Sequence, residues 1–397
     1  MSSEFPLFLL PMLVLNRILK LMTPFELVAI SLCSKKSKML CKSARSQMEC
    51  RTGTNMFLLK FSSNKEIRLE FIYHMKIQWV FKIEWAPKRN QILPRKSLLR
   101  RFLSIFQKTP QEVHTTTFSQ LGTNFIVPDW IPTEDTSEVS LKVFTSRDSG
   151  FADVNTFILY LSDVFNTRLT DFELHYHDFN REDNEKIVDF YFRNSENKKS
   201  LSSLSLVGAH PNASEDDELI DLILCRQEAD CRLKLSMEHT SNFQFKTEYF
   251  RNKPILVELH DSSWISFDQF LEMESYTIAL YRSIFKFTDF KLLIEKWNSG
   301  WTPKWRVIMV ESSEEVNIDE CVSELVVLGR FSEVQVERSE VKDEYSDGGV
   351  SQRIIYKIHR SDKAVGQIFV ENSFMFSLYV MIDSEKNSRL YPQVFLS

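Results

Sequence analysis

The first fifty residues are predicted to form short apolar helices opened by prolines, and this feature constrains the fold more than any other. Pro11 suits the first turn of a helix, because its missing N–H would have no partner there. Two adjacent apolar stripes recur at helical spacing: Val14, Ile18 and Leu21, then Leu15, Leu19 and Met22. A module of three short helices cannot bury this much apolar surface by itself. We therefore expect the segment to bind a partner or to pack against its own C-terminal domain.

The second helix carries its own start signal. Thr23-Pro24-Phe25-Glu26 predicts a capping box, in which the Thr23 hydroxyl accepts from the Glu26 N–H and the Glu26 carboxylate accepts from the Thr23 N–H. Four apolar residues follow at positions suited to a short helix: Leu27, Val28, Ile30 and Leu32.

The third helical segment is basic. Ser34 can cap a helix from Lys35 to about Gln47, with Met39 and Leu40 directed inward and the lysines outward. Residues 1–50 contain seven Lys and Arg and three acids, whereas the whole chain has a net charge of −5, so the remainder carries −9. This split suggests two modules with different surfaces. The acidic remainder argues against non-specific binding to nucleic acid.

Composition and cysteine usage favour an intracellular globular protein. Apolar residues make up 43% of 397 residues, and the six cysteines form no CxxC pair, so we expect reduced thiols and no zinc. The apolar run from Phe5 to Leu15 has Glu4 where a signal peptide carries basic residues. It is also too short for a bilayer, which takes about 20 apolar residues. The sequence therefore predicts cytoplasmic or nuclear residence, or both, and no membrane partner.

Residues 57–85 alternate between apolar and polar positions as strands do. Three apolar runs, at residues 57–61, 67–71 and 80–85, predict a small antiparallel sheet. A helix is predicted near Ser97–Gln107, between prolines that punctuate the neighbouring sequence.

A loose repeat begins near residue 140. Short apolar strands are centred near Val143, Leu174, Leu206, Leu235, Val257, Ile278, Ile308 and Val336. Helical patterns lie between several of them, at residues 154–165, 183–192, 216–224 and 289–297. Strand and helix alternating at this period predict an irregular leucine-rich-repeat-like solenoid. The alternative is a doubly wound α/β sheet, although no glycine-rich first turn supports it.

The L-x-x-L-x-L pattern of such repeats occurs at Leu201–Leu206 and, with one aromatic residue, at Leu169–Leu174. Ala209 and His177 replace the asparagine or cysteine expected next, which predicts irregular curvature. Beyond residue 330, runs at residues 334–336, 354–358, 366–370 and 376–382 predict an antiparallel sheet that caps the repeats.

The run from Phe5 to Leu40 resembles the F-box of nematode F-box proteins. The segment from Leu256 to Val310, with Trp264, Lys286–Phe290 and the W-x-x-G step at Trp297–Gly300, resembles the F-box-associated region of type 2. Three positions depart from these patterns: Leu13 replaces a common Glu, the third helix lacks a Trp, and Trp305 replaces a common Leu.

The resemblance implies an adaptor whose F-box grips a Skp-family linker and, through it, a cullin. By position it implies these linker-binding residues: Pro6, Leu7, Leu10, Pro11, Val14, Ile18, Pro24, Leu27 and Leu32.

The residues that could carry catalysis or bind a metal favour structural roles. His175 and His177 would share one face of a strand, but no third or fourth metal ligand is evident nearby. The acids at residues 215–218 suit a helix start, and a calcium loop would need spaced ligands and a glycine. Cys225 lies near Glu228 and Asp230, which disfavour a reactive thiolate. No P-loop, G-x-S-x-G or H-E-x-x-H motif occurs, so we expect no catalytic residue, cofactor or metal.

The sequence thus predicts an α+β or α/β chain with four segments: an F-box at 1–50, a connecting region at 51–139, a leucine-rich-repeat-like domain at 140–330 and an antiparallel cap at 331–397. The predicted function is a non-catalytic substrate-recognition adaptor of an SCF-type ubiquitin ligase that binds an unknown client protein. Two alternatives stay open: a solenoid scaffold that acts without a ligase, and an enzyme with a dispersed site in an α/β domain.

Overall fold

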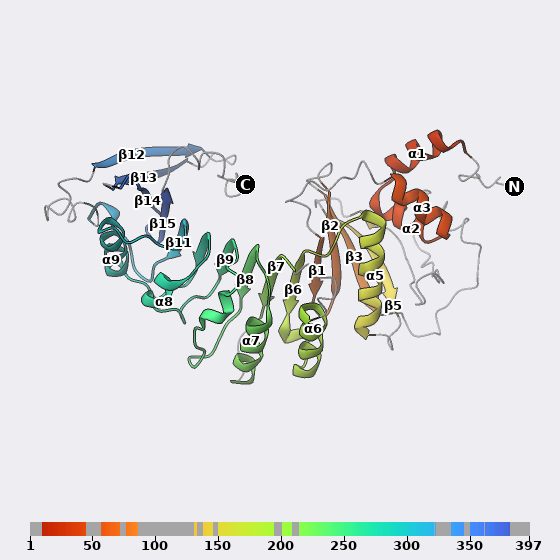
Figure 1. Ribbon diagram of the computed structural model, residues 1–397, viewed down its shortest axis with the longest axis horizontal. Helices are drawn as coiled ribbons and strands as arrows, with labels where there is room; N and C mark the ends of the chain where they lie inside the picture. The colour runs from red at the N-terminus through yellow and green to blue at the C-terminus, as the bar shows by residue number, and fades with distance from the viewer. Residues whose placement is uncertain are drawn as a thin grey trace. The chain divides into compact units, whose positions relative to one another are not determined.

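The computed structural model describes residues 10–44, 57–71, 77–85, 131–132, 138–145, 150–193, 201–208, 214–320, 322, 335–344, 350–360 and 362–381. The chain divides into two compact units, residues 1–191 and 192–397, and each is considered by itself. Figure 1 shows their elements in chain order. The helix predicted near Ser97–Gln107 lies outside the described residues.

Unit 1 begins with three helices and continues into a mixed sheet. Its helices are α1 (Met12–Leu21), α2 (Pro24–Ser31), α3 (Lys35–Ala44), α5 (Gly150–Phe165) and α6 (Arg181–Arg193), with a 3₁₀ turn η6 (Tyr176–Asp178). Its strands are β1 (Phe57–Phe61), β2 (Lys65–Glu70), β3 (Gln78–Trp85), β4 (Ile131–Pro132), β5 (Glu138–Thr145) and β6 (Asp171–His175). Within this unit the strand order is β6-β1-β2-β3-β5-β4.

The small antiparallel sheet predicted for residues 57–85 is confirmed. β1, β2 and β3 pair antiparallel, and Leu59 lies opposite Ile67, which lies opposite Phe81. These three side chains are fully buried, because alternate residues of each strand face the same side of the sheet. β6 and β5 join the sheet at opposite ends in parallel orientation.

Unit 2 combines parallel strands and their helices with an antiparallel region. Its first strands are β7 (Ser203–Val207), β8 (Arg232–Ser236), β9 (Leu256–Leu259), β10 (Thr277–Leu280) and β11 (Val307–Glu311). The connections contain α7 (Ser214–Arg226), the 3₁₀ turn η8 (Thr247–Phe250), α8 (Phe267–Glu272) and α9 (Phe287–Asn298). The remaining strands are β12 (Gln335–Glu344), β13 (Val350–His359), β14 (Val365–Glu371) and β15 (Met375–Met381).

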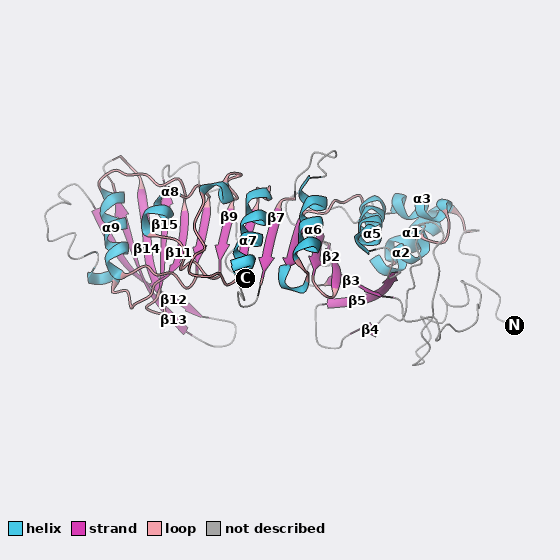
Figure 2. Cartoon of the chain, turned by 90° about the horizontal axis from the view of Figure 1, so that it is seen from below, coloured by secondary structure: helices cyan, strands magenta, loops and turns pink. Residues whose placement is uncertain are grey.

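The strands of unit 2 follow the order β12-β13-β14-β15-β11-β10-β9-β8-β7. β7 to β11 are parallel, whereas β12 to β15 are antiparallel and join through the β11–β15 pair. The parallel register aligns two buried rows, Leu204-Leu233-Val257-Ile278-Ile308 and Leu206-Leu235-Leu259-Leu280-Val310. Figure 1 shows α7, α8 and α9 on the same side of these strands, and Figure 2 shows them together in front of the sheet. The architecture is mixed α/β with an antiparallel part; its leucine-rich-repeat character stays a prediction.

The W-x-x-G step at the end of α9 forms a glycine cap. Gly300 has a φ of 103°, the left-handed region where a side chain is unfavourable, and its N–H donates to the Trp297 carbonyl. Trp297 is fully buried, and the Arg360 guanidinium donates to its carbonyl at 2.8 Å. A Cβ at Gly366 would approach the Trp297 ring to 2.9 Å, so this strand position has room only for glycine.

Three local predictions were wrong or incomplete. Met39 points outward, with 66% of its surface exposed, because the third helix buries Leu40 and Cys41 instead. His177 lies in the turn η6 rather than on β6, so it does not share a strand face with His175. α8 was not predicted, since six residues are too short for a clear helical period. Among the described helices, none is both long and apolar enough to cross a bilayer.

Candidate functional site

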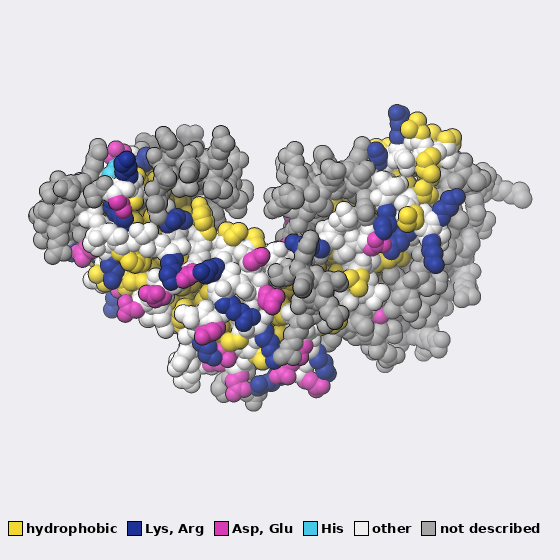
Figure 3. Space-filling view, in the orientation of Figure 1, with side chains coloured by type: hydrophobic (Ala, Val, Ile, Leu, Met, Phe, Trp, Pro, Cys, Tyr) yellow, Lys and Arg dark blue, Asp and Glu magenta, His cyan; other side chains and the backbone are white. Residues whose placement is uncertain are grey.

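The outer surface of α1 is apolar and exposed. Leu15 and Leu19 are buried, whereas leucine, methionine and valine side chains of the helix reach solvent beside the exposed Arg17 and Lys20. The exposed fractions are 59% for Met12, 71% for Leu13, 42% for Val14 and 86% for Leu21, with Met39 of α3 at 66%. Figure 3 shows hydrophobic side chains gathered where Figure 1 places α1. A patch of this kind is typical of a protein-binding surface.

α2 packs inward on the sheet of unit 1. The Phe25 ring meets Trp79 and Phe81 of β3 edge to face, with centroids 5.1 and 5.0 Å apart. The predicted capping box fixes the helix start, with the Thr23 N–H donating to the Glu26 carboxylate at 2.7 Å. The helix is therefore held both by its own cap and by aromatic contacts with the sheet.

Polar contacts fasten α2 and α3 to α5. The hydroxyls of Ser31 and Tyr160 share a buried hydrogen bond of 2.7 Å. Lys38 and Lys42 both pair with Asp163, and Lys38 also lies 4.3 Å from the centre of the Tyr160 ring. Hydrogen bonds from the two lysines lower the pKa of Asp163. Part of the basic face of α3 is thus used inside unit 1.

In the described part of unit 2 the helices α7, α8 and α9 lie on one face of the parallel strands, and the other face is called the open face. Side chains that alternate with the buried rows belong to this face, and many are polar. Glu258 stands at its centre and accepts from Arg232, Lys234 and His260. Burial raises the pKa of Glu258, but these three donors outweigh it and lower the pKa to about 2. The cations around Glu258 are therefore already paired.

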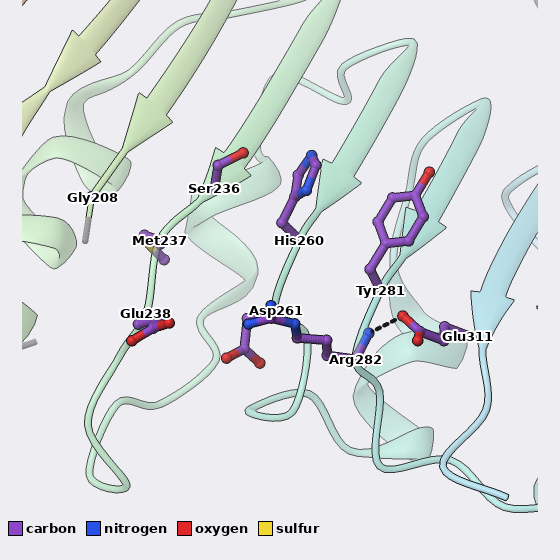
Figure 4. Close-up of a pocket in the computed structure, with 9 residues that line it drawn as sticks. All are labelled: Gly208, Ser236, Met237, Glu238, His260, Asp261, Tyr281, Arg282 and Glu311. Atoms are coloured by element: carbon purple, nitrogen blue, oxygen red, sulfur yellow. Dashed lines mark hydrogen bonds between the residues drawn. The ribbon is translucent and has the colours of Figure 1, made fainter. Parts of the chain in front are cut away.

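A cavity of about 370 Å³ opens where the parallel strands of unit 2 end. It is lined by Gly208, Ser236, Met237, Glu238, His260, Asp261, Tyr281, Arg282 and Glu311. Figure 4 shows the His260 and Tyr281 rings side by side on neighbouring strands, and their centroids are 5.3 Å apart. Arg282 adopts a φ of 50°, and its N–H donates to Glu311 Oε2 at 2.7 Å.

The comparisons with known proteins concern the first three helices. Residues 7–47 match the F-box domain. No curated protein and no solved structure matches the chain. F-box domains typically bind Skp-type linkers and, through them, cullins, and F-box proteins are generally non-catalytic ubiquitin-ligase subunits. The F-box therefore suggests an adaptor role in general terms.

The predicted linker-binding residues of the F-box occupy three kinds of position. Pro11 and Val14 are exposed on the outer side of α1. Leu10 and Ile18 are partly exposed. Pro24, Leu27 and Leu32 are buried inside unit 1, and Pro6 and Leu7 lie outside the described residues. Their role in linker binding stays a prediction.

Sequence reasoning omitted four exposed apolar residues of the F-box from the predicted set: Met12, Leu13, Leu21 and Met39. Leu13 carried a signal, because leucine stands there in place of the family's common glutamate. Met39 carried none, since its helical position fits an inward side chain equally well.

The other candidates for chemistry have structural partners. His175 contacts Glu173 at 2.6 Å, and no cluster of three or more His, Cys, Asp or Glu suited to a metal occurs among the described residues. Burial and Asp221 raise the pKa of the Cys225 thiol, which disfavours the thiolate. Trp297 and Trp305 are fully buried, whereas Trp264 and Trp301 are partly exposed.

Proposed function

We propose that this chain is the substrate-recognition adaptor of an SCF-type cullin ubiquitin ligase. In this proposal the F-box binds a Skp-family linker, the repeat domain at residues 140–330 binds a client protein, and ubiquitin transfer takes place on other subunits. The observation that carries the proposal is an F-box match whose first helix exposes an apolar surface. Holding the client beside the ligase raises its local concentration, which is the whole kinetic contribution expected of the chain.

The linker-binding surface that we propose combines α1 and the exposed side of α3. Its members are the predicted residues Pro11 and Val14 together with Met12, Leu13, Leu21 and Met39. Burying one leucine or methionine side chain contributes about 1.5–3 kcal/mol. A few such side chains can therefore contribute a large part of a stable contact.

For the client-binding part we propose an irregular leucine-rich-repeat-like solenoid. In-register parallel strands and helices on one side support this assignment, and the glycine-capped end of α9 supports the resemblance to the F-box-associated region of type 2. The nematode-type assignment and an intracellular location belong to the same proposal. The division into segments at residues 50, 139 and 330 also remains a proposal.

The deciding experiment is co-purification of the full chain with a Skp-family linker. Leu13→Asp with Leu21→Asp should abolish the complex, because two carboxylates would be buried at an apolar contact. Leu292→Asp is the matched control, since Leu292 is an exposed leucine of α9, with 41% of its surface accessible, outside the F-box. Leu10→Asp with Pro11→Ala tests the residues predicted from sequence. A folded Leu13/Leu21 variant that still binds the linker would count against the proposal.

A further inference from the structure

The chemistry of the open face in unit 2 points to the kind of client it can hold. Residues 192–397 contain 33 Asp and Glu but 24 Lys and Arg, a net formal charge of −9. The lining of the cavity is also acidic, because it includes three carboxylates and one guanidinium. The charge of this unit therefore complements a basic partner.

The carboxylate Glu258 of the open face and the carboxylates of the cavity differ in how they are compensated. Glu258 has three cationic side chains around it, from Arg232, Lys234 and His260. Asp261 accepts instead from the backbone N–H and hydroxyl of Ser263, and His239 Nε2 lies 3.6 Å from its Oδ1. Asp261 thus has one histidine near it, whereas Glu258 has an arginine, a lysine and a histidine, so the cavity favours an incoming cation more than the Glu258 cluster does.

Glu311 also accepts from a neutral backbone donor. Its Oε2 accepts from the backbone N–H of Arg282, and its own carbonyl accepts from the Ser283 hydroxyl. Figure 4 shows Glu238, Asp261 and Glu311 at the ends of different strands, around the cavity that also contains the Tyr281 ring. An aromatic face beside carboxylates is a favourable environment for Lys or Arg.

Two exposed apolar residues lie in loops whose backbone is bonded to the residues after Glu311. Ile284 is 53% exposed and lies two residues after Arg282, while Phe374 is 47% exposed in the turn before β15. Ser313 Oγ donates to the Ile284 carbonyl, and the Ser312 N–H donates to the Phe374 carbonyl at 2.8 Å. The same two serines directly follow Glu311, so the apolar pair and the cavity are fixed to one strand end.

We propose that the open face of unit 2 binds an extended basic segment of the client. A Lys or Arg side chain of that segment enters the cavity between Asp261 and Glu311, beside Tyr281. A neighbouring apolar side chain packs on Ile284 and Phe374. This inference rests on the proposed function, because it names the chemistry of the client that the adaptor would present.

The test uses the full chain and labelled peptides of equal length, measured by fluorescence anisotropy. The probe alternates lysine with leucine and serine, and two matched peptides carry glutamate or glutamine in place of each lysine. The lysine peptide should bind, and its affinity should fall as the salt concentration rises. The double variant Asp261→Asn with Glu311→Gln should bind the lysine peptide with about tenfold lower affinity, since both substitutions keep a hydrogen-bond acceptor but remove the charge.

The matched control is Asp268→Asn with Glu272→Gln. Both residues are exposed on α8, on the helix-covered side, and the net charge changes by the same amount. This variant should bind the lysine peptide within about twofold of the parent. Phe374→Ser should weaken the leucine-containing lysine peptide, but not one with serine at every leucine position.

Several outcomes would overturn the inference: equal binding of the lysine and glutamate peptides, equal losses in the two double variants, or no binding of the lysine peptide. Linker capture by the same preparations separates this result from the adaptor proposal. Linker capture without peptide binding removes the basic-client inference alone. Peptide binding without linker capture removes the adaptor function and keeps the basic-segment site.

Discussion

α1 and α2 are adjacent apolar helices with opposite surroundings. α2 buries Phe25, Leu27 and Val28 against the rest of unit 1, whereas α1 leaves Leu13 and Leu21 in solvent. Hydrophobic side chains stabilise a fold only where the chain can cover them. The comparison indicates that α2 belongs to the core of unit 1, whereas several apolar side chains of α1 stay exposed. Variants of the two helices should therefore affect different properties.

The comparison also bears on truncation experiments. Removing residues 1–50 would delete α1 but also expose Trp79, Phe81 and Tyr160, which α2 and α3 contact. A truncated chain that fails to bind a linker could fail through unfolding of unit 1. Point variants on α1 avoid this ambiguity, because they leave the contacts of α2 and α3 in place.

The largest expected effect comes from Phe25→Ala. Removing a buried aromatic ring between Trp79 and Phe81 should lower the free energy of unfolding of unit 1 by about 3–5 kcal/mol. Denaturant unfolding followed by tryptophan fluorescence measures it. If Phe25→Ala lowered the free energy of unfolding no more than a substitution at an exposed leucine does, the contrast between a buried α2 and an exposed α1 would be wrong.

An intermediate effect is expected at the bond between α2 and α5. Ser31→Ala leaves the Tyr160 hydroxyl buried without this partner and should cost about 1–3 kcal/mol. Tyr160→Phe should cost less, because Ser31 still donates to the Val28 carbonyl. A double-mutant cycle on unfolding free energies isolates the coupling, and a coupling of zero would show that the hydroxyls act independently.

Asp163→Asn should have a smaller, pH-dependent effect. Lys38 and Lys42 lower the folded-state pKa of Asp163, so its contribution is fully present above the unfolded pKa of about 4. The contribution is lost as pH falls through the lower folded pKa. The carboxyl is partly exposed, so the loss at neutral pH should stay below about 1 kcal/mol. The difference in unfolding free energy between parent and variant should shrink as the pH falls from neutral to acidic. A difference that grew on acidification would contradict the assignment.

The smallest effect on stability is expected for Leu13→Ser and Leu21→Ser. Both side chains are exposed, so the free energy of unfolding should change by about 0.5 kcal/mol or less. Linker binding should nevertheless fall sharply. Calorimetric titration of the linker, beside thermal unfolding of the same samples, measures both quantities. A variant that lost stability and kept binding would reverse the proposed roles of α1 and α2.

Local rules in the sequence predicted much of the fold. The capping box at Thr23 and Glu26, the Ser34 cap of α3 and the glycine after α9 are all present. The strand centres from Val143 to Val336 all lie within strands. These features depend on hydrogen bonds and periodicities within a few residues, which a sequence contains directly.

Tertiary structure alone decided which apolar residues are covered. Met39 and Leu40 are equally plausible inward residues in sequence, yet only Leu40 is buried. The cavity of unit 2 unites residues from Gly208 to Glu311, and no local pattern joins them. Parallel strands align distant strand ends at one edge, so such a site exists only once the register forms. The sequence by itself thus determined most of the described helices, strands and caps, whereas long-range packing determined the exposed face of α1 and the acidic cavity.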